Sequence, residues 1–256
     1  MTMVVTVIFV FGLIIGSFLN ALIYRLSVAD SVFRGRSYCP DCKHVLASRD
    51  LVPVVSYIAL RSRCRYCKKK ISIQYPAVEL ATAISFLLIY LRFIGGGSQH
   101  ALLMIGAYML YTCFLIVIFV YDLRYYLILD VVTLPAIVIG FALNMLLGVS
   151  WVSMLMGAIV AGGFFALQFF FSRGKWIGGG DIRLGALMGV LTPWPYILVA
   201  LFIAYLSGSI IGMGLMMSRM KHLESKLPFG TFLTVATFIT MLWGPQLLQW
   251  YLHFYV

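Results

Sequence analysis

Two aspartates in otherwise apolar surroundings are the residues of this chain best suited to acid–base chemistry. Asp122 stands at the end of one long hydrophobic run, and Asp181 follows Gly178, Gly179 and Gly180 at the start of another. Two carboxylates held close together in a partly dry site cannot both ionise easily, so they share a proton. One can then accept a proton from water while the other polarises a carbonyl group. The pattern indicates aspartyl-type hydrolysis; helix capping, an ion path and simple topology are the alternatives.

A second candidate site consists of four cysteines in two C-x-x-C pairs. Cys39 and Cys42 form the first pair, Cys64 and Cys67 form the second, and 21 residues separate the two. Two such pairs can surround a tetrahedral ion with four thiolates. We therefore expect structural zinc, with redox-active or unligated thiols as the alternatives. His44 lies close by, but with four cysteines available we expect it to be solvated.

Two further acidic residues stand at the boundaries of apolar segments. Asp130, in "LILDVVTLP", precedes a helical segment. It can cap the first helical turn, support a neighbouring site or take part in chemistry directly. Glu79 follows Pro76 in what we expect to be the first turn of a helix, where the helix dipole favours an anion. A functional role facing the cysteine segment is the alternative for Glu79.

Composition identifies the solvent of this chain as a lipid bilayer. The sequence is 62% hydrophobic and 11% charged, with a mean hydropathy of +1.01. Apolar windows of about 20 residues recur, and each can cross the hydrocarbon core of a membrane. We expect an all-α polytopic membrane protein with about eight transmembrane helices, at 3–23, 77–94, 101–121, 127–148, 151–171, 182–192, 195–217 and 229–250. The sixth is too short to cross unless it borrows residues from the glycines before it or the turn after it.

Charge orients these spans. Residues 25–76 hold eleven Lys and Arg against three Asp, and the positive-inside rule places such a segment in the cytoplasm. Alternation then puts both termini outside, with Asp122 and Asp181 at the cytoplasmic edge and further basic residues, including those of 219–226, on the same side. A reducing cytoplasm disfavours disulfides. Because topology explains the basic charge, we expect anionic lipid headgroups and no nucleic acid as its partner.

The chain divides into three regions. Residues 1–24 form the first transmembrane helix, 25–76 the cysteine-bearing insert, and 77–256 the remaining bundle. The insert is too small to fold well on its own core, so a metal would supply much of its stability. The glycines before Asp181 predict irregular backbone. Such backbone is tolerated at membrane depth only where it lines a cavity, and there it lets a substrate chain approach.

Five segments in order resemble one family. They are "GSFLNALIYRL", "CPDC" with "LVPVVSYIALRSRCRYC", "ISIQYPAVELATA", "YDLRYYLILDVVTLP" and "GGGDIRLGALMG". Together they resemble the bacterial prepilin peptidases, also called type IV leader peptidases, which are GxGD-type membrane aspartyl proteases. The likeness covers nearly the whole chain. One departure is Leu129, where many members carry proline in Ile-Pro-Asp, and from it we expect a changed loop shape without loss of activity.

The resemblance implies a bifunctional enzyme of the bacterial inner membrane with its active sites facing the cytoplasm. Such enzymes remove the basic leader from type IV prepilins or pseudopilins and then methylate the new amino terminus with S-adenosylmethionine. Carried over by motif, the protease aspartates are Asp122 and Asp181, with the glycines and Asp130 as support. The cysteine insert and its flanks are linked to methyl transfer, which makes Glu79 a candidate there. No particular oligomeric state is implied.

Two rival hypotheses remain. A membrane transporter with intramembrane carboxylates and a zinc-bound regulatory domain would carry acidic residues near mid-span, whereas here they lie at span ends. A peptidase that has lost methylation would still process prepilins, and the mass of the processed pilin separates it from the bifunctional enzyme.

Overall fold

The computed structural model describes residues 2–31, 35–95, 100–218 and 227–253. The chain forms two compact units, Met1–Ala101 and Leu102–Val256. Helices dominate both, and the described residues contain no β-strand, only two isolated bridges between single residue pairs. The basic loop expected at 219–226 lies outside the described residues. The predicted all-α architecture is confirmed.

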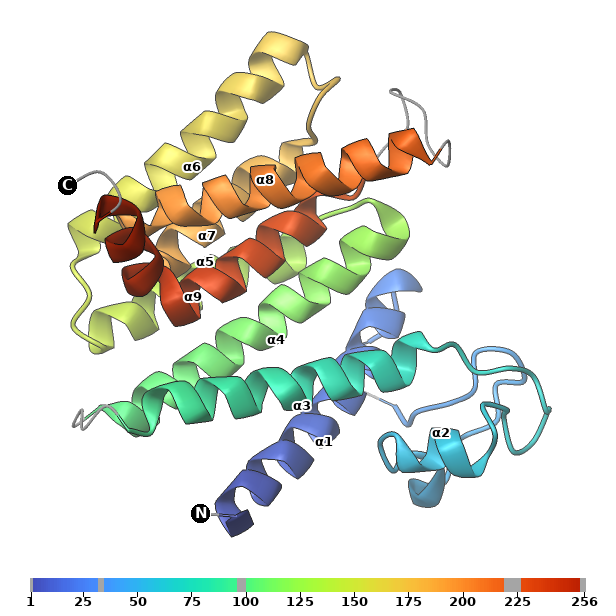
Figure 1. The fold of residues 1–256 in the computed structure, drawn as a ribbon. Helices are drawn as coiled ribbons and strands as arrows, with labels where there is room; N and C mark the ends of the chain where they lie inside the picture. Colours follow the sequence, from blue (N-terminus) through green and yellow to red (C-terminus); the bar gives the residue numbers. More distant parts are fainter. Residues whose placement is uncertain (1, 32–34, 96–99, 219–226, 254–256) are drawn as a thin grey trace. The chain divides into compact units, whose positions relative to one another are not determined.

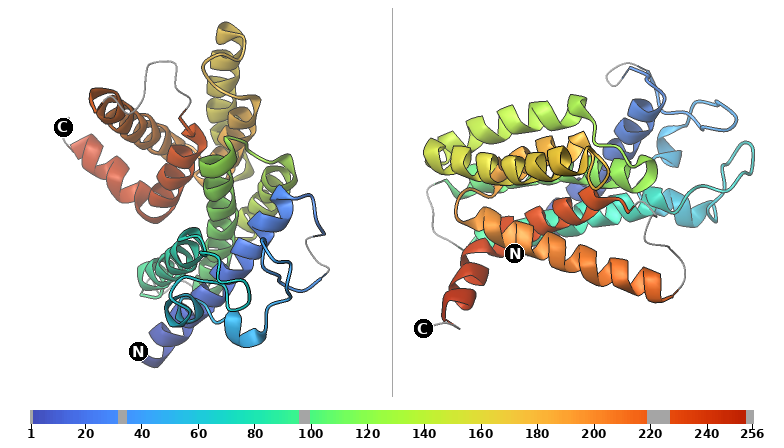
Figure 2. Two further views of the ribbon diagram at one scale, coloured as in Figure 1. Left: turned by 90° about the vertical axis from the view of Figure 1, so that its right-hand side faces the viewer. Right: turned by 90° about the horizontal axis from the view of Figure 1, so that it is seen from above.

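The first unit is built on two long helices that pack against each other (Figures 1 and 2). These are α1 (Thr2–Ser27) and α3 (Gln74–Phe93). Gly12 and Gly16 allow the two backbones to approach, because a Cβ at Gly12 would lie 2.5 Å from the Ala83 Cα and one at Gly16 would lie 2.6 Å from the Glu79 Cα. Small residues at one-turn spacing permit such close packing between membrane helices.

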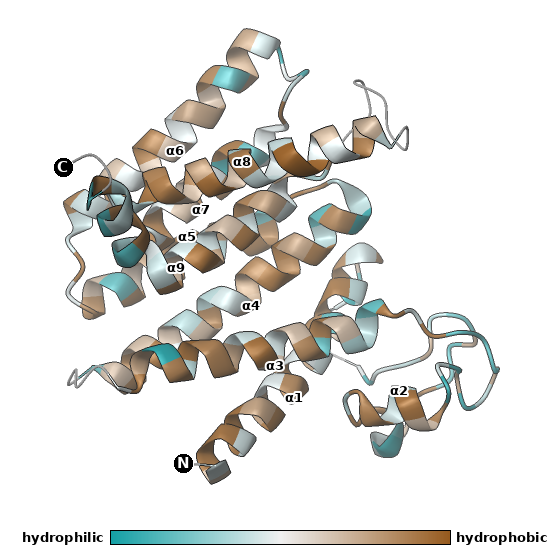
Figure 3. Ribbon diagram, in the orientation of Figure 1, coloured by the Kyte–Doolittle hydropathy of each residue, from teal (hydrophilic) through white to brown (hydrophobic). Residues whose placement is uncertain are grey.

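The cysteine insert connects α1 to α3. It contains the short helices η1 (Ser48–Asp50) and α2 (Val55–Ala59) and the two isolated bridges, which pair Tyr38 with Val45 and Arg63 with Lys70. Figure 3 shows that its loops are largely hydrophilic, in contrast to the helices around it. So little regular structure in about 50 residues agrees with a segment whose fold depends on a metal.

The described residues of the second unit form a bundle of six helices. They are α4 (Ala101–Tyr125), α5 (Asp130–Leu146), α6 (Trp151–Ser172), α7 (Gly179–Leu191), α8 (Tyr196–Met217) and α9 (Phe229–His253). The short helix α7 lies among α5, α6, α8 and α9 and contacts all four (Figure 1). Its Leu184, Leu187 and Met188 side chains are fully buried. The neighbouring helices therefore shield α7 from lipid, which lets a helix too short to span a bilayer lie inside the bundle.

The predicted spans agree with the helices, apart from the two shortest. Among the residues that the structure describes, six helices are long and apolar enough to cross a membrane, whereas α5 has 17 residues and α7 has 13. Helix α7 does take in Gly179 and Gly180, as its predicted shortness required. The expectation of irregular backbone at these glycines is wrong for these two, because both adopt helical conformation in the first turn of α7. Gly178 alone stays extended, as the N-cap.

Candidate active site and metal centre

Asp122 is buried in the last two turns of α4 and is held by the start of α9. Asp122 is 5% exposed. Its Oδ2 accepts a hydrogen bond of 3.0 Å from the backbone N–H of Thr231. The first N–H groups of a helix have no partner within the helix. Asp122 therefore caps α9 from another helix. Gly230 is needed beside it, since a Cβ there would lie 2.9 Å from the same oxygen.

Asp181 is buried at the start of α7 and caps its own helix. It is the third residue of α7 and is 7% exposed. Its Oδ2 accepts a hydrogen bond of 2.9 Å from the backbone N–H of Gly178. This is the capping arrangement in which an acidic side chain reaches back to the N-cap residue. The side chain is thereby fixed within the first turn.

The structure brings Asp122 and Asp181 into one site. Gly180, which precedes Asp181, and Gly230, which faces the Asp122 Oδ2, both lie against the same side chain, and each carboxylate lies at the amino-terminal end of a helix, where the dipole favours negative charge. Between the two helix ends lies Ile128, from the connection of α4 to α5. A Cβ at Gly180 would lie 2.9 Å from the Ile128 Cβ, and one at Gly230 would lie 3.2 Å from the Ile128 Cδ1.

Asp130 does not cap α5. The N-cap position is Leu129, no side-chain capping bond is present there, and Asp130 is the first helical residue. Its carboxylate instead forms an ion pair with Arg183 of α7, two residues beyond Asp181. Both side chains of this pair are nearly half exposed. The capping part of the expectation is therefore wrong. The ion pair ties the start of α5 to the first turns of α7, and support of the neighbouring site by Asp130 stays a prediction.

The four cysteines form one cluster. Their sulfur atoms all lie within 4.8 Å of one another, and the Sγ atoms of Cys39 and Cys67 are 3.9 Å apart. Four thiolates arranged tetrahedrally at about 2.3 Å from a zinc ion would be about 3.8 Å from each other. The donor set and its spacing therefore fit zinc. Cys42 and Cys64 complete the set, and His44 is exposed and stacks on Tyr66 with ring centroids 3.6 Å apart.

The two cysteine pairs share one backbone geometry. In the first, the N–H of Lys43 donates to the Cys39 carbonyl at 2.9 Å, and in the second the N–H of Lys68 donates to the Cys64 carbonyl at 3.0 Å. Both lysines have left-handed backbone, with φ of +59° and +61°. Each pair thus forms a tight turn that presents two sulfurs toward the same point. Repetition of one turn geometry is typical of a four-cysteine zinc site.

Two ion pairs offset charge within the insert. Lys69 lies 2.8 Å from Asp41 and so joins the second cysteine turn to the first, while Arg65 lies 2.7 Å from Asp50. Burial raises the pKa of the Asp50 carboxyl, but the hydrogen bond from Arg65 and further donors outweigh it and hold that pKa below its usual value. Asp50 is therefore ionised at neutral pH and anchors the second turn.

The thiols differ in their electrostatic surroundings. Burial raises the pKa of the Cys39 thiol to about 11. Burial acts in the same direction on Cys64, but backbone N–H groups of Cys67 and Tyr66 outweigh it and lower the pKa of that thiol to about 7. The N–H groups that surround Cys64 are thus arranged for a thiolate, the form that binds metal.

Glu79 is buried on α3 beneath the insert. It is 6% exposed and is the sixth residue of the helix, one turn later than the sequence predicted. Its Oε2 accepts a hydrogen bond of 2.7 Å from the backbone N–H of Val54. Val54 has a φ of +60°, which is an outlier for a β-branched residue. Glu79 thus fixes a strained position of the insert.

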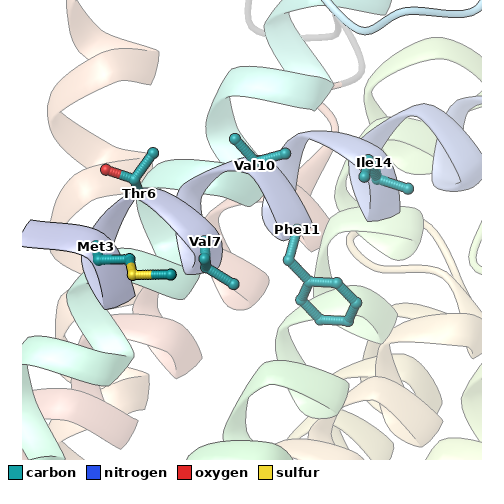
Figure 4. A pocket seen from close by; sticks show the side chains of 6 residues that line it. All are labelled: Met3, Thr6, Val7, Val10, Phe11 and Ile14. Carbon is teal, nitrogen blue, oxygen red and sulfur yellow. The ribbon is translucent and has the colours of Figure 1, made fainter.

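A shallow groove runs along one face of α1. Its volume is about 570 Å³, and Figure 4 shows that the side chains lining it, all from α1, are apolar apart from one threonine. The lining residues are Met3, Thr6, Val7, Val10, Phe11 and Ile14. The threonine hydroxyl donates to the Thr2 carbonyl of its own helix. A surface with no ionisable group is typical of lipid contact and offers nothing for catalysis.

Several residues of the site were missed by sequence reasoning. Thr231 holds Asp122 through its backbone, Gly230 leaves room for the carboxylate, and Ile128 and Arg183 contact the segment around Asp181. The one signal that could have found part of this set is "LPFGT", which places a proline and a glycine just where an apolar helix begins. The other contacts have no local sequence signature.

Comparisons with known proteins match two regions of the chain to protein families. Residues 10–93 match the family described as the bacterial peptidase A24 N-terminal domain, and residues 109–213 match the type IV leader peptidase family. The first match includes all four cysteines, and the second includes Asp122 and Asp181. No solved structure matches this chain.

Relatives extend the match over nearly the whole chain. The prepilin leader peptidase/N-methyltransferase of Aeromonas hydrophila is 30% identical over 96% of this chain and 93% of its own length. The proteins of the same name from Stutzerimonas stutzeri and Pseudomonas aeruginosa are each 31% identical, over 96% and 95% of this chain. The resemblance seen in the sequence is thus confirmed, and the chain belongs to the type IV leader peptidase family.

Proposed function

We propose that this protein cleaves the leader of type IV prepilins or pseudopilins by an aspartyl mechanism and then methylates the new amino terminus. The observation that supports the peptidase activity is the pair Asp122 and Asp181, two buried carboxylates at helix starts whose glycines both adjoin Ile128. The names of the relatives support both the peptidase activity and the methyltransferase activity. The four clustered cysteines favour the bifunctional enzyme over a peptidase alone.

The chemistry follows from one proton shared between two carboxylates. The ionised carboxylate takes a proton from water as the water oxygen bonds to the scissile carbonyl carbon. The protonated carboxyl gives its proton to the carbonyl oxygen. The tetrahedral intermediate then collapses and the C–N bond breaks. The carboxyl that received the proton from water gives it to the leaving amine, while the other carboxylate takes back the proton from the diol oxygen as the C=O bond re-forms, which restores the single shared proton. The N–H groups of Thr231 and Gly178 orient the two carboxylates for this exchange.

The substrate class suits the position of the pair. A prepilin has a basic leader followed by an apolar helix, so its cleavage point lies at a membrane boundary. Asp122 is near the end of α4, and Asp181 is at the start of α7. With residues 25–76 in the cytoplasm, as the positive-inside rule requires, these helix ends face the cytoplasm too. In a transporter, the alternative function, we would expect the carboxylates near the middle of the membrane spans instead.

For methyl transfer we propose the insert and its support on α3. S-adenosylmethionine would supply an electrophilic methyl group attached to a positively charged sulfur. A buried carboxylate such as Glu79 fits a cationic ligand better than any other described group of the first unit. Its hydrogen bond to Val54 also fixes the insert on α3. Zinc at Cys39, Cys42, Cys64 and Cys67 would hold the insert folded without taking part in the reaction.

Co-expression with a candidate prepilin tests both activities at once. The pilin is purified from membranes and its mass is measured with and without this protein. We expect loss of the leader together with a gain of one methyl group at the new amino terminus. Leader loss without the methyl group would contradict the methyltransferase half, and an unprocessed prepilin of every class offered would contradict the peptidase.

A further inference from the structure

The side chain of Ile128 touches the two helix ends that carry the catalytic pair. It lies in the short connection Tyr126–Leu129, between α4 and α5. A Cβ at Gly180 would meet the Ile128 Cβ at 2.9 Å and its Cγ1 and Cδ1 at 3.6 Å. A Cβ at Gly230 would meet the Cδ1 at 3.2 Å. One side chain therefore fills the space that two glycines leave open.

These glycines are the immediate neighbours of the site. Gly180 directly precedes Asp181, and Gly230 directly precedes Thr231, whose N–H holds Asp122 at 3.0 Å. Contact with Ile128 on one side thus fixes the first turn of α7, and contact on the other side fixes the first turn of α9. Because each aspartate is bonded to one of these turns, the thickness of this side chain sets how far apart the turns stand.

The backbone before Ile128 directs it to this place. Tyr126, the first residue after α4, has a φ of +56°, and its N–H donates to the Asp122 carbonyl at 2.9 Å. A left-handed residue at this point reverses the chain, so that Ile128 returns toward the helix turn that bears Asp122. Two residues later, the ion pair of Asp130 with Arg183 holds the far end of the connection against α7.

We propose that Ile128 is a positioning residue of the peptidase, a spacer that sets the separation of Asp122 and Asp181. This inference rests on the proposed aspartyl function. An isoleucine suits the task because branching at Cβ restricts its rotamers. An apolar side chain next to the two carboxylates also offers them no competing hydrogen bond. The geometry of a dyad must admit one water molecule and keep the shared proton, so a small error in spacing lowers the rate of the chemical step.

The test compares variants by cleavage of a prepilin in detergent, with kcat and KM measured separately. Ile128→Ala removes the atoms that reach Gly230 and most of those that reach Gly180. We expect kcat to fall by about 100-fold, the effect of a displacement of about 1 Å, with KM little changed and the pH profile altered. Ile128→Val keeps the branch and should lose only a few-fold. Leu127→Ala, in the same connection and 58% exposed, is the matched control and should cleave normally.

A size swap makes the test independent of stability. Gly180→Ala places a methyl group 2.9 Å from the Ile128 Cβ and should reduce cleavage strongly, whereas adding Ile128→Gly, which removes that Cβ, should restore part of the lost kcat. Methylation of an already cleaved pilin serves as the check that each variant is inserted and folded. The spacer is contradicted if Ile128→Ala cleaves like Leu127→Ala, or if the double variant is no better than Gly180→Ala. Failure of the aspartyl function itself would show differently, as cleavage that survives loss of either aspartate.

Discussion

The backbone N–H of Thr231 lies 3.0 Å from the Oδ2 of Asp122, so the first turn of α9 holds a carboxylate that belongs to α4. The two residues are 109 positions apart in the chain. On the other side of the site, Gly178 holds Asp181 from within the same turn. In the candidate dyad, one carboxylate is thus held by its own helix and the other by a helix distant in sequence. The two helix ends must keep their relative position for the two carboxylates to lie in one site.

Substitution of Gly230 tests directly whether the position of the α9 helix end matters for the site. In Gly230→Ala the new methyl group would lie 2.9 Å from the Asp122 Oδ2, so we expect cleavage to fall by about 100-fold through displacement of the carboxylate. The control is Gly214→Ala in α8, where a Cβ meets nothing within 4 Å. Alanine in place of a helical glycine stabilises a helix by about 1 kcal/mol, so the control should be active and slightly more stable. Equal activity of the two variants would contradict the claim that the start of α9 positions Asp122.

The ion pair of Asp130 with Arg183 is expected to contribute modestly. Both side chains are nearly half exposed, and exposed pairs contribute about 0.2–1 kcal/mol. Asp130→Asn should therefore slow cleavage by less than about fivefold, and the effect should shrink in high salt. The exchange of charges, Asp130→Arg with Arg183→Asp, should recover activity relative to either single variant. A loss far above tenfold in Asp130→Asn would instead place this carboxylate in the chemistry.

Removal of the metal should separate the two activities. Cys64→Ser takes one of the four sulfurs from the cluster, and we expect zinc to be lost and methyl transfer with it. Leader cleavage should persist, because both aspartates lie in the second unit. Metal content, measured by elemental analysis of the purified protein, should be one zinc per chain in the wild type and in Cys113→Ser. Wild-type protein without bound metal would contradict the site, and equal loss of both activities would contradict their separation.

The bond between Glu79 and Val54 predicts a difference between two substitutions. Glu79→Gln keeps an oxygen that can accept the Val54 N–H but removes the charge, whereas Glu79→Ala removes both. If the carboxylate acts through its charge, both variants lose methylation. If it only holds the insert, glutamine is tolerated and alanine is not. We expect both Glu79 variants to lose methylation, and only Glu79→Ala to make the insert more sensitive to protease. Val54→Gly relieves a strained φ, so its insert should resist protease better than that of the wild type.

The sequence predicted the parts of this molecule that depend on local pattern. Apolar runs predicted eight helices, and the six that are long enough to span a membrane match the length that the hydrocarbon core requires. The spacing of Cys39, Cys42, Cys64 and Cys67 marked the cluster, since two residues between thiols already confine them to one turn. The shortness of the helix after Asp181 was also visible, and its location among four other helices accounts for it.

Contacts between distant elements could not be read in the same way. The acidic residue at the start of an apolar run was expected to cap it, yet Asp130 pairs with Arg183, because the packing of α5 on α7 brings an opposite charge within reach. Gly179 and Gly180 were expected to break the helix, yet the packing of α7 against four neighbouring helices outweighs their low helix propensity. Ile128 carries no pattern at all, since an isoleucine beside a membrane helix is unremarkable until its neighbours are known.

Substitution of the two aspartates tests the central claim most directly. Asp122→Asn and Asp181→Asn keep the shape of each side chain and one acceptor oxygen, and Asp30→Asn in the first unit serves as the matched control. Each variant is co-expressed with a prepilin, and leader removal is followed by the mass of the pilin recovered from membranes. The account predicts a loss of cleavage of roughly 1,000-fold or more for either dyad variant, with normal processing by the control and with methylation of a pre-cleaved pilin retained by all three. Normal processing by Asp122→Asn or Asp181→Asn would contradict it.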